Sequence, residues 1–340
     1  MTASRLNHLP LARLHSVNMT STEVKTLHSG QYEAFAELWK SNEWPIAADL
    51  LTKIAPATPS EKHDRRHFFA IPDPSNDSKL QAGGATFLQG SVAGIGLILV
   101  HKDHQRKGLG SKIFRKCLDA ALEEEETKIV WLTATTAGAP VYRRMGFEDS
   151  GAVTFLAHKT GPKEKGFHVP EGHRFSHVAA KDTPVEAVKM FNDALVGGSR
   201  GDLMRDTDTH SVLLYSDDRL IAWAGVILEQ DVPTNVGPII VESEDTPISV
   251  VMALVDEVVA TYAPQSPKGL VLSIDHRFGS SKTLDLLLSE SGGWSKVDFN
   301  LVTMINFEKT GSRAWYAEHF GPERKKDGPV QLAYFGLGFS

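Results

Sequence analysis

One glycine-rich loop carries residues whose types and spacing suit the binding of an anion. It consists of Gln105, Arg106, Lys107, Gly108, Leu109 and Gly110. The loop follows an apolar stretch that ends at Val100 and precedes a helical pattern that begins at Ser111. A helix N-terminus offers unpaired backbone N–H groups and a favourable dipole, and glycines let the main chain approach an anion closely. The loop therefore predicts a site for a phosphate or a pyrophosphate.

The spacing of the glycines excludes two common phosphate-binding loops. No Gly-Lys-Ser or Gly-Lys-Thr sequence stands at this place, so the loop is not of the Walker type. Gly108 and Gly110 also lack the third glycine that follows three residues later in a dinucleotide-binding loop. By itself a Gly-x-Gly after a strand is also an ordinary turn. The interpretation therefore depends on the surrounding sequence.

A second motif lies further along the chain, where Tyr142 in a short helical pattern precedes the pair Gly146-Phe147. Together with the loop, this motif resembles the GNAT acetyltransferase superfamily, whose pyrophosphate loop has the pattern Gln/Arg-x-x-Gly-x-Gly/Ala. The resemblance implies an α/β fold, with an α+β mixed sheet flanked by helices. It also implies acetyl-CoA as the acetyl donor and no metal.

A longer stretch, from Leu132 to Tyr142, is similar to a Leu-Asp-Ala-Thr-Pro-Ala-Gly-x-Pro-Val-Tyr sequence. That sequence occurs in a GNAT subgroup with a second, degenerate GNAT-like domain. Three stretches resemble characteristic segments of the second domain, namely Gly197–Arg200, Val236–Ile240 and Ala333–Gly338. The resemblance covers most of residues 23–340 and implies two GNAT-like domains in tandem.

The resemblance implies the parts that hold the donor. The pantetheine is expected to pair with the backbone at the end of the apolar strand, and its pyrophosphate is expected in the loop. The expected donor-binding residues are Leu99, Val100, Gln105, Arg106, Lys107, Gly108, Leu109, Gly110, Ser111 and Thr135.

Three positions depart from the subgroup pattern and concern the acceptor. Thr133 replaces an aspartate, Lys102 replaces a proline, and Pro45 replaces an asparagine after Trp44. We expect Trp44, Glu43 and Thr133 to line the acceptor pocket. If the aspartate and the asparagine position the acceptor in relatives, the acceptor of this chain differs.

Tyr142 matches the general acid of the family. Its phenol, with an ordinary pKa near ~10, can protonate a thiolate as the sulfur leaves. The alternative is a tyrosine of the hydrophobic core with no part in catalysis.

The general base does not follow from the family pattern. Many relatives carry a glutamate on the central strand, but residues 93–100 contain no ionisable side chain. We expect His101 to act as the base, because the pKa of histidine suits proton abstraction near neutral pH. His104, Glu43, Asp49, or a water relay without a dedicated base remain alternatives.

The elements that position these motifs follow from hydrophobic periodicity. Helices are predicted over residues 31–39, 47–54, 111–122 and 140–145, and strands over 67–71, 82–89, 93–100 and 128–133. The order then partly repeats, with helices predicted over 184–195, 248–262 and 282–289. Strands of the second half are predicted over 211–215, 219–228, 237–241 and 270–274, with a final strand over 299–307. We expect an extension (1–22), a first domain (23–160), a linker (161–172) and a second domain (173–340).

The second half lacks a counterpart of the anion-binding loop. Residues 241–247 occupy the equivalent place, contain three acidic side chains and have no glycine. Acidic groups repel a pyrophosphate at short range. The second domain is therefore expected to bind no donor and to contribute to the acceptor cleft.

The composition limits the remaining possibilities. The chain has 340 residues and a net charge of -6, which argues against a nucleic-acid partner. No apolar stretch suggests a membrane partner. Cys117 is the only cysteine and falls on an apolar helix stripe, so we expect it in the core. The fourteen histidines show no metal-ligand spacing. We expect a cytoplasmic monomer or homodimer, and a mitochondrial presequence in residues 1–18 remains an alternative.

The resemblance implies an acetyl-CoA-dependent N-acetyltransferase. The expected acceptor is a primary amine of a small molecule, acetylated by direct transfer in a ternary complex. Two alternatives remain open, namely acetylation of protein or peptide lysines and a non-catalytic regulator that binds acetyl-CoA.

Overall fold

A computed structural model describes residues 23–27, 31–42, 66–158, 169, 171–194, 209–276, 281–289, 293–321 and 328–334. Several expected features lie outside these residues. They are the extension 1–22, Trp44 and Glu43 of the acceptor pocket, the helix 47–54, the landmark Gly197–Arg200 and most of the linker 161–172.

The strands of the described residues join into one mixed sheet of thirteen strands. Its order is β1-β2-β3-β4-β5-β12-β6-β11-β13-β10-β9-β8-β7. In chain order the strands are β1 (Lys25–Thr26), β2 (Arg66–Asp73), β3 (Asn76–Gln89), β4 (Val92–Val100), β5 (Ile129–Thr135), β6 (Phe147–His158), β7 (His173–Ala179), β8 (Thr209–Ser216), β9 (Arg219–Ile227), β10 (Thr234–Val241), β11 (Leu270–Asp275), β12 (Trp294–Asn306) and β13 (Val330–Tyr334).

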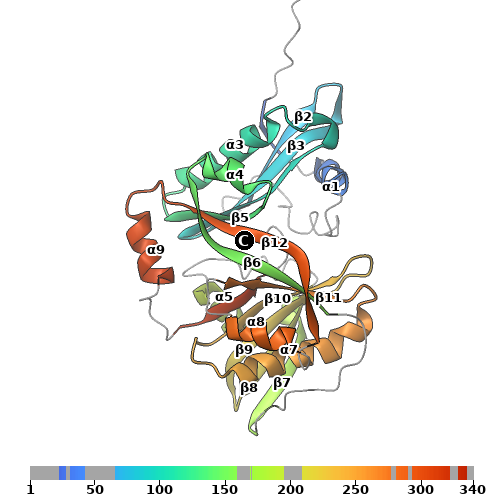
Figure 1. Ribbon diagram of the computed structural model, residues 1–340, viewed down its shortest axis with the longest axis vertical. Coiled ribbons are helices and arrows are strands. Elements are labelled where there is room, and N and C mark those ends of the chain that lie inside the picture. Colours follow the sequence, from blue (N-terminus) through green and yellow to red (C-terminus); the bar gives the residue numbers. More distant parts are fainter. Residues whose placement is uncertain are drawn as a thin grey trace, which may run out of the picture.

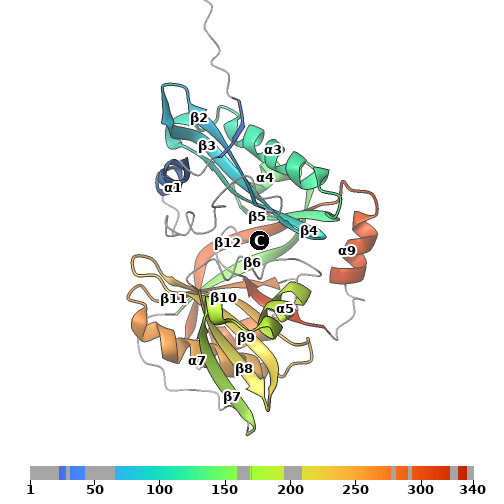
Figure 2. The same cartoon turned by 180° about the vertical axis from the view of Figure 1, so that it is seen from behind.

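Helices cover both faces of this sheet, as Figures 1 and 2 show. They are α1 (Tyr32–Lys40), α3 (Leu109–Glu123), α4 (Ala139–Arg143), α5 (Val185–Ala194), α7 (Ile248–Tyr262), α8 (Ser281–Leu288) and α9 (Ser312–Phe320). The short 3-10 helices are η2 (Lys102–His104), η3 (Ala180–Asp182) and η4 (Ala263–Gln265). The expected fold class, a mixed sheet flanked by helices, is confirmed.

Two adjacent glycines of β3 let α1 and α3 pack closely on opposite faces of the first half of the sheet. A Cβ atom on Gly83 would lie 2.2 Å from Phe35 of α1, and one on Gly84 would lie 2.5 Å from Ile113 of α3. Successive strand residues point to opposite faces, so each glycine serves one helix. Cys117 of α3 is fully buried, as expected, and burial raises the pKa of its thiol to about 12.

The second half repeats the strand order of the first. Strands β8, β9 and β10 are antiparallel neighbours, and β10 pairs in parallel with β11, as β4 pairs with β5. Helix α7 takes the place of α3. The stretch Ile248–Gln265 is the one stretch of the described chain with the length and apolar composition of a membrane span, and 61% of it is buried. Buried core helices share these properties.

The two halves exchange strands at the middle of the sheet (Figure 1). Strand β12, from the second half, lies between β5 and β6 of the first half. Strand β6, from the first half, lies between β12 and β11 of the second. Each half therefore completes the sheet of the other.

The expectation that residues 299–307 form the last strand is wrong. Strand β12 begins earlier, at Trp294, and β13 follows at Val330–Tyr334. The first part of β12 is mostly exposed and carries polar side chains. A search for apolar stretches therefore does not detect it as a strand.

Candidate functional site

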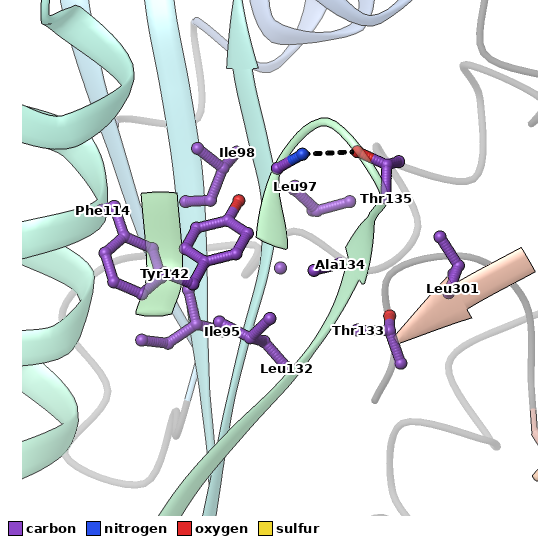
Figure 3. A pocket seen from close by; sticks show the side chains of 12 residues that line it. Ile95, Leu97, Ile98, Phe114, Leu132, Thr133, Ala134, Thr135, Tyr142 and Leu301 are labelled. Atoms are coloured by element: carbon purple, nitrogen blue, oxygen red, sulfur yellow. Dashed lines mark hydrogen bonds between the residues drawn. The ribbon is translucent and has the colours of Figure 1, made fainter. Parts of the chain in front are cut away.

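The first half of the sheet opens between its two parallel strands. Strand β4 pairs with β5 only from Val92–Gly94 to Ile129–Trp131, and the strands separate beyond this point. A cavity of about 170 Å³ lies in the opening (Figure 3). It is lined by Ile95, Gly96, Leu97, Ile98, Phe114, Leu132, Thr133, Ala134, Thr135, Gly138, Tyr142 and Leu301.

A β-bulge in β4 faces this cavity. Ala85 of β3 pairs with Gly96, whereas Gly83 pairs with Leu99, so β4 contains one extra residue. Leu97 has a φ of 59°, a left-handed conformation that a leucine rarely adopts. A bulge disrupts the ladder locally and leaves a residue unpaired. Strain of this kind persists where the surrounding structure enforces it, often at a functional site.

The glycine-rich loop leads from β4 into α3 and forms an anion cradle. Gly108 has a φ of 77° and Arg106 a φ of 61°, so the loop turns twice through left-handed conformations. The first helical hydrogen bond runs from the Lys112 N–H to the Gly108 carbonyl. The N–H groups of the three preceding residues therefore have no acceptor within the helix.

A groove of about 280 Å³ connects the loop with the cavity. Groove and cavity share Ile98, Gly138 and Tyr142, so they form one continuous depression. The expected donor-binding residues that line this depression are Val100, Gln105, Arg106, Gly108, Leu109, Gly110, Ser111 and Thr135.

The side chains of two expected donor-binding residues do not line the depression. The Lys107 ammonium donates a hydrogen bond to the Asp103 carbonyl (2.9 Å) and is not part of the groove wall. Leu99 is buried in the core that α1 covers, because odd-numbered residues after the bulge face α1. Ile98 and Val100 face α3 instead.

Tyr142 stands between the groove and the cavity. Its ring packs against Phe114 with 4.6 Å between the ring centroids, and Figure 3 shows its hydroxyl oxygen turned away from Phe114. Burial raises the pKa of Tyr142 to about 12, with a smaller contribution from the Cys117 thiol. Among the described residues, no hydrogen bond to this hydroxyl is formed. Tyr142 is therefore a phenol at neutral pH, and no described residue accepts a hydrogen bond from it.

The structure does not bring His101 together with Tyr142. The His101 side chain accepts a hydrogen bond from the Asp103 N–H (3.3 Å) and lines a separate pocket of about 760 Å³ beside α1. His104 lines the same pocket and lies 3.6 Å from a carboxylate oxygen of Asp73. The role of His101 as a base stays a prediction.

The wall of the cavity formed by β5 and β12 combines both halves of the chain. Thr133 lines the cavity, as expected, and the Thr135 hydroxyl accepts a hydrogen bond from the Gly138 N–H (3.1 Å). Leu301 of β12 completes this wall opposite Thr135 and is 5% exposed. Sequence patterns could not show Leu301, because only the strand exchange brings it to the site. The strain at Leu97 also has no sequence signal.

The equivalent opening in the second half is filled by the chain itself. Strand β10 pairs with β11 from Thr234–Val236 to Leu270–Leu272, as β4 pairs with β5. Beyond this point, β13 inserts and pairs antiparallel with both strands. The acidic segment before α7 thus stands beside an opening that holds a strand of the same chain.

No group of three or more potential metal ligands occurs within the described ranges. Two exposed ion pairs join residues near the start of β6 to α4 and α9. Arg143 binds Asp149 through two hydrogen bonds, and Arg313 of α9 binds Glu148.

Comparisons with known proteins agree with this architecture. Residues 64–149 match the family described as the acetyltransferase (GNAT) domain. The chain is 27% identical over 236 residues to a Bacillus subtilis (strain 168) protein named uncharacterized N-acetyltransferase YitH, covering 68% of this chain and 77% of that protein.

Two solved structures resemble the whole chain. One is a putative acetyltransferase from Pyrococcus horikoshii, with a TM-score of 0.62, 15% identity, and coverage of 96% of this chain and 98% of the other. The other is a tandem GNAT protein from the clavulanic acid biosynthesis pathway, with a TM-score of 0.59, 13% identity, and coverage of 83% and 97%. At these identities the two structures establish the fold.

Proposed function

We propose that this chain, a GNAT acyltransferase with two GNAT-type units in tandem, transfers the acetyl group of acetyl-CoA directly to a primary amine of a small molecule. The observation that carries the proposal is the continuous depression that joins the anion cradle to Tyr142. In this proposal the pyrophosphate binds at the cradle, the pantetheine arm lies along the groove, and the thioester lies beside Tyr142.

The cradle fits the pyrophosphate by its free N–H groups and its charge. The N–H groups at the start of α3 point along the helix axis, and Arg106 lines the groove beside them. Gly110 lies close to Val100, because a Cβ atom added to Gly110 would lie 3.3 Å from the Val100 side chain. The open edge of β4 beyond Gly94 can pair with the amide groups of the pantetheine, as an added strand would.

The bound donor supplies an activated acetyl group. In this proposal, backbone N–H groups at the Leu97 bulge would stabilise the negative charge that develops on the carbonyl oxygen. The Tyr142 hydroxyl donates a hydrogen bond to the sulfur as the carbon–sulfur bond breaks. A thiol has an ordinary pKa of ~8.5, so a phenol with a pKa of about 12 is the weaker acid and the proton moves late.

A direct test combines binding with turnover. Acetyl-CoA at ~100 times its Kd should stabilise the folded chain by about 2.7 kcal/mol, which a thermal shift detects. Mass spectrometry should then show acetylation of small free amines. Acetylation of lysine peptides alone would favour a protein acetyltransferase, and binding without any transfer would favour a regulator. A melting temperature that acetyl-CoA does not change would contradict the proposal.

A further inference from the structure

The continuous depression has an outer and an inner part, and three residues mark the boundary between them. The groove at the cradle and the cavity between β4 and β5 share Ile98, Gly138 and Tyr142 among their described lining residues. In the proposed function, a donor that lies along the groove brings its sulfur to this boundary, beside the Tyr142 hydroxyl. The space beyond the boundary is then left for the acyl group and for the attacking nitrogen.

The cavity beyond the boundary passes through the sheet, in the gap between β4 and β5. Leu97 and Leu301 belong to the core that α1 covers. The groove lies on the other side of the sheet, because Ile98 and Val100 face α3. Four side chains of the cavity also face α3, and they form the wall that a donor in the groove reaches first. This α3-side wall consists of Ile95, Phe114, Leu132 and Ala134.

The α3-side wall is buried and apolar. Each of its four side chains is at most 2% exposed, and none has a hydrogen-bonding group (Figure 3). The hydroxyls of Thr133 and Thr135 also line the cavity, but these residues alternate along β5 with Leu132 and Ala134. Successive strand residues point to opposite faces, so both hydroxyls lie on the α1 side. An apolar chain would therefore find its matching surface on the α3 side.

The cavity is larger than an acetyl group needs. Its volume is about 170 Å³. An apolar cavity of about 150 Å³ binds benzene, which has six heavy atoms. The acetyl group and the attacking nitrogen together bring four heavy atoms, namely two carbons, one oxygen and one nitrogen. Space for about two further carbons therefore remains.

Resting on the proposed function, we propose that the donor site takes a four-carbon acyl group, and that it binds and uses butanoyl-CoA in preference to acetyl-CoA. The two additional methylenes pack against the α3-side wall. The amine nitrogen forms its bond to the carbonyl carbon while the carbon–sulfur bond breaks. The sulfur gains one proton from Tyr142, and the proton that the nitrogen loses returns to Tyr142 through water. Atoms and charge balance with either acyl group.

The first test compares the Kd values of a series of acyl-CoA donors for the full chain by calorimetry. Each buried methylene should tighten binding about fourfold, so butanoyl-CoA should bind about 15-fold more tightly than acetyl-CoA. Octanoyl-CoA should bind more weakly than butanoyl-CoA, because its chain exceeds the volume of the cavity. With a small amine as acceptor, mass spectrometry should show the butanoyl product.

Three results would overturn the proposal. One is a Kd for butanoyl-CoA that is less than about fourfold below that for acetyl-CoA. Another is an affinity that rises steadily up to octanoyl-CoA, because such a rise would indicate a chain lying on an open apolar surface. The third is tight binding of butanoyl-CoA without transfer of its acyl group.

A pair of matched variants tests where the chain lies. Ala134→Val fills part of the cavity and should reduce the ratio of the two Kd values to less than about fourfold. Ala93→Val is the control, because Ala93 is a buried alanine of the same hydrophobic cluster that does not line the cavity, and it should keep the native ratio. Equal ratios in the two variants would overturn the placement. If Ala134→Val does not fold, Leu132→Ala enlarges the cavity and should shift the preference to hexanoyl-CoA, and an unshifted preference would overturn it.

The same titrations separate this inference from the proposed function. Acetyl-CoA that binds and acetylates an amine, with no tighter binding of butanoyl-CoA, would refute the chain-length inference and leave the proposed function intact. Absence of binding by every acyl-CoA of the series would refute the proposed function itself.

Discussion

Tyr142→Phe removes one hydroxyl from the centre of the site and leaves the ring in place. The ring packs against Phe114 and Phe147, at centroid distances of 4.6 Å and 6.5 Å, and phenylalanine keeps both contacts. Within the described structure the hydroxyl makes no hydrogen bond that folding would lose. We therefore expect little change in the free energy of unfolding and a clear loss of turnover.

The size of the loss follows from the charge that the hydroxyl contacts. A hydrogen bond to a charged group contributes about 1.5–3 kcal/mol, and a leaving thiolate carries such a charge. Removal of the donor should lower kcat by about 10- to 150-fold. The Kd of acetyl-CoA should change little, because the sulfur of the thioester is uncharged before the reaction.

The assay measures kcat with a small amine, the Kd of acetyl-CoA by calorimetry, and the melting temperature. Tyr262→Phe provides the control, because Tyr262 is a buried tyrosine of α7 in the second half. A Tyr142→Phe variant with the kcat of the native chain would remove Tyr142 from the mechanism. If the fall in kcat were accompanied by a large fall in the melting temperature, Tyr142 would be assigned to the hydrophobic core rather than to catalysis.

Three further predictions concern packing and backbone conformation. Leu301→Ala and Ile305→Ala each remove a buried side chain from the same face of β12, and each should cost about 2–5 kcal/mol of stability. Only Leu301→Ala should change the KM of the acceptor, because only Leu301 lines the cavity. Equal effects of the two variants on KM would contradict the placement of Leu301 in the acceptor site. The Cys117 thiol should resist alkylation in the folded chain, and rapid alkylation at pH 8 would contradict its burial. Its contribution to stability should be lost as the pH rises from 9.0 to about 12, because the thiol of the unfolded chain ionises at a lower pH than that of the folded chain. Gly108→Ala should cost about 1–2 kcal/mol through its φ of 77°, although the added Cβ would meet no described atom within 4 Å beyond its chain neighbours. An unchanged chemical denaturation midpoint would contradict this.

The cofactor half of the site follows from sequence because its signals are local. An apolar strand, a glycine-rich loop and an amphipathic helix stand in succession, and the structure has them as β4, the cradle and α3. Tyr142 lies on the short helix that the motif predicts. Alternate residues of a strand face opposite sides of the sheet, and this explains the position of His101. His101 faces α1, as Leu97 and Leu99 do.

The acceptor half depends on contacts between distant parts of the chain. Leu301 reaches the cavity because β12 crosses into the first half of the sheet. The register that places it opposite Thr135 is set by strand pairing rather than by neighbouring residues. Strand β13 is short and lies at the end of the described chain, so no periodicity reveals that it fills the opening between β10 and β11.

Calorimetric titration of acetyl-CoA into the full chain tests the central claim most directly. One molecule should bind per chain, because the second opening holds β13. Arg106→Gln, in the loop before α3, should weaken binding by up to about fivefold, whereas Arg115→Gln, an exposed control on α3, should leave it unchanged. Two molecules per chain, no binding, or equal effects of the two variants would contradict the account.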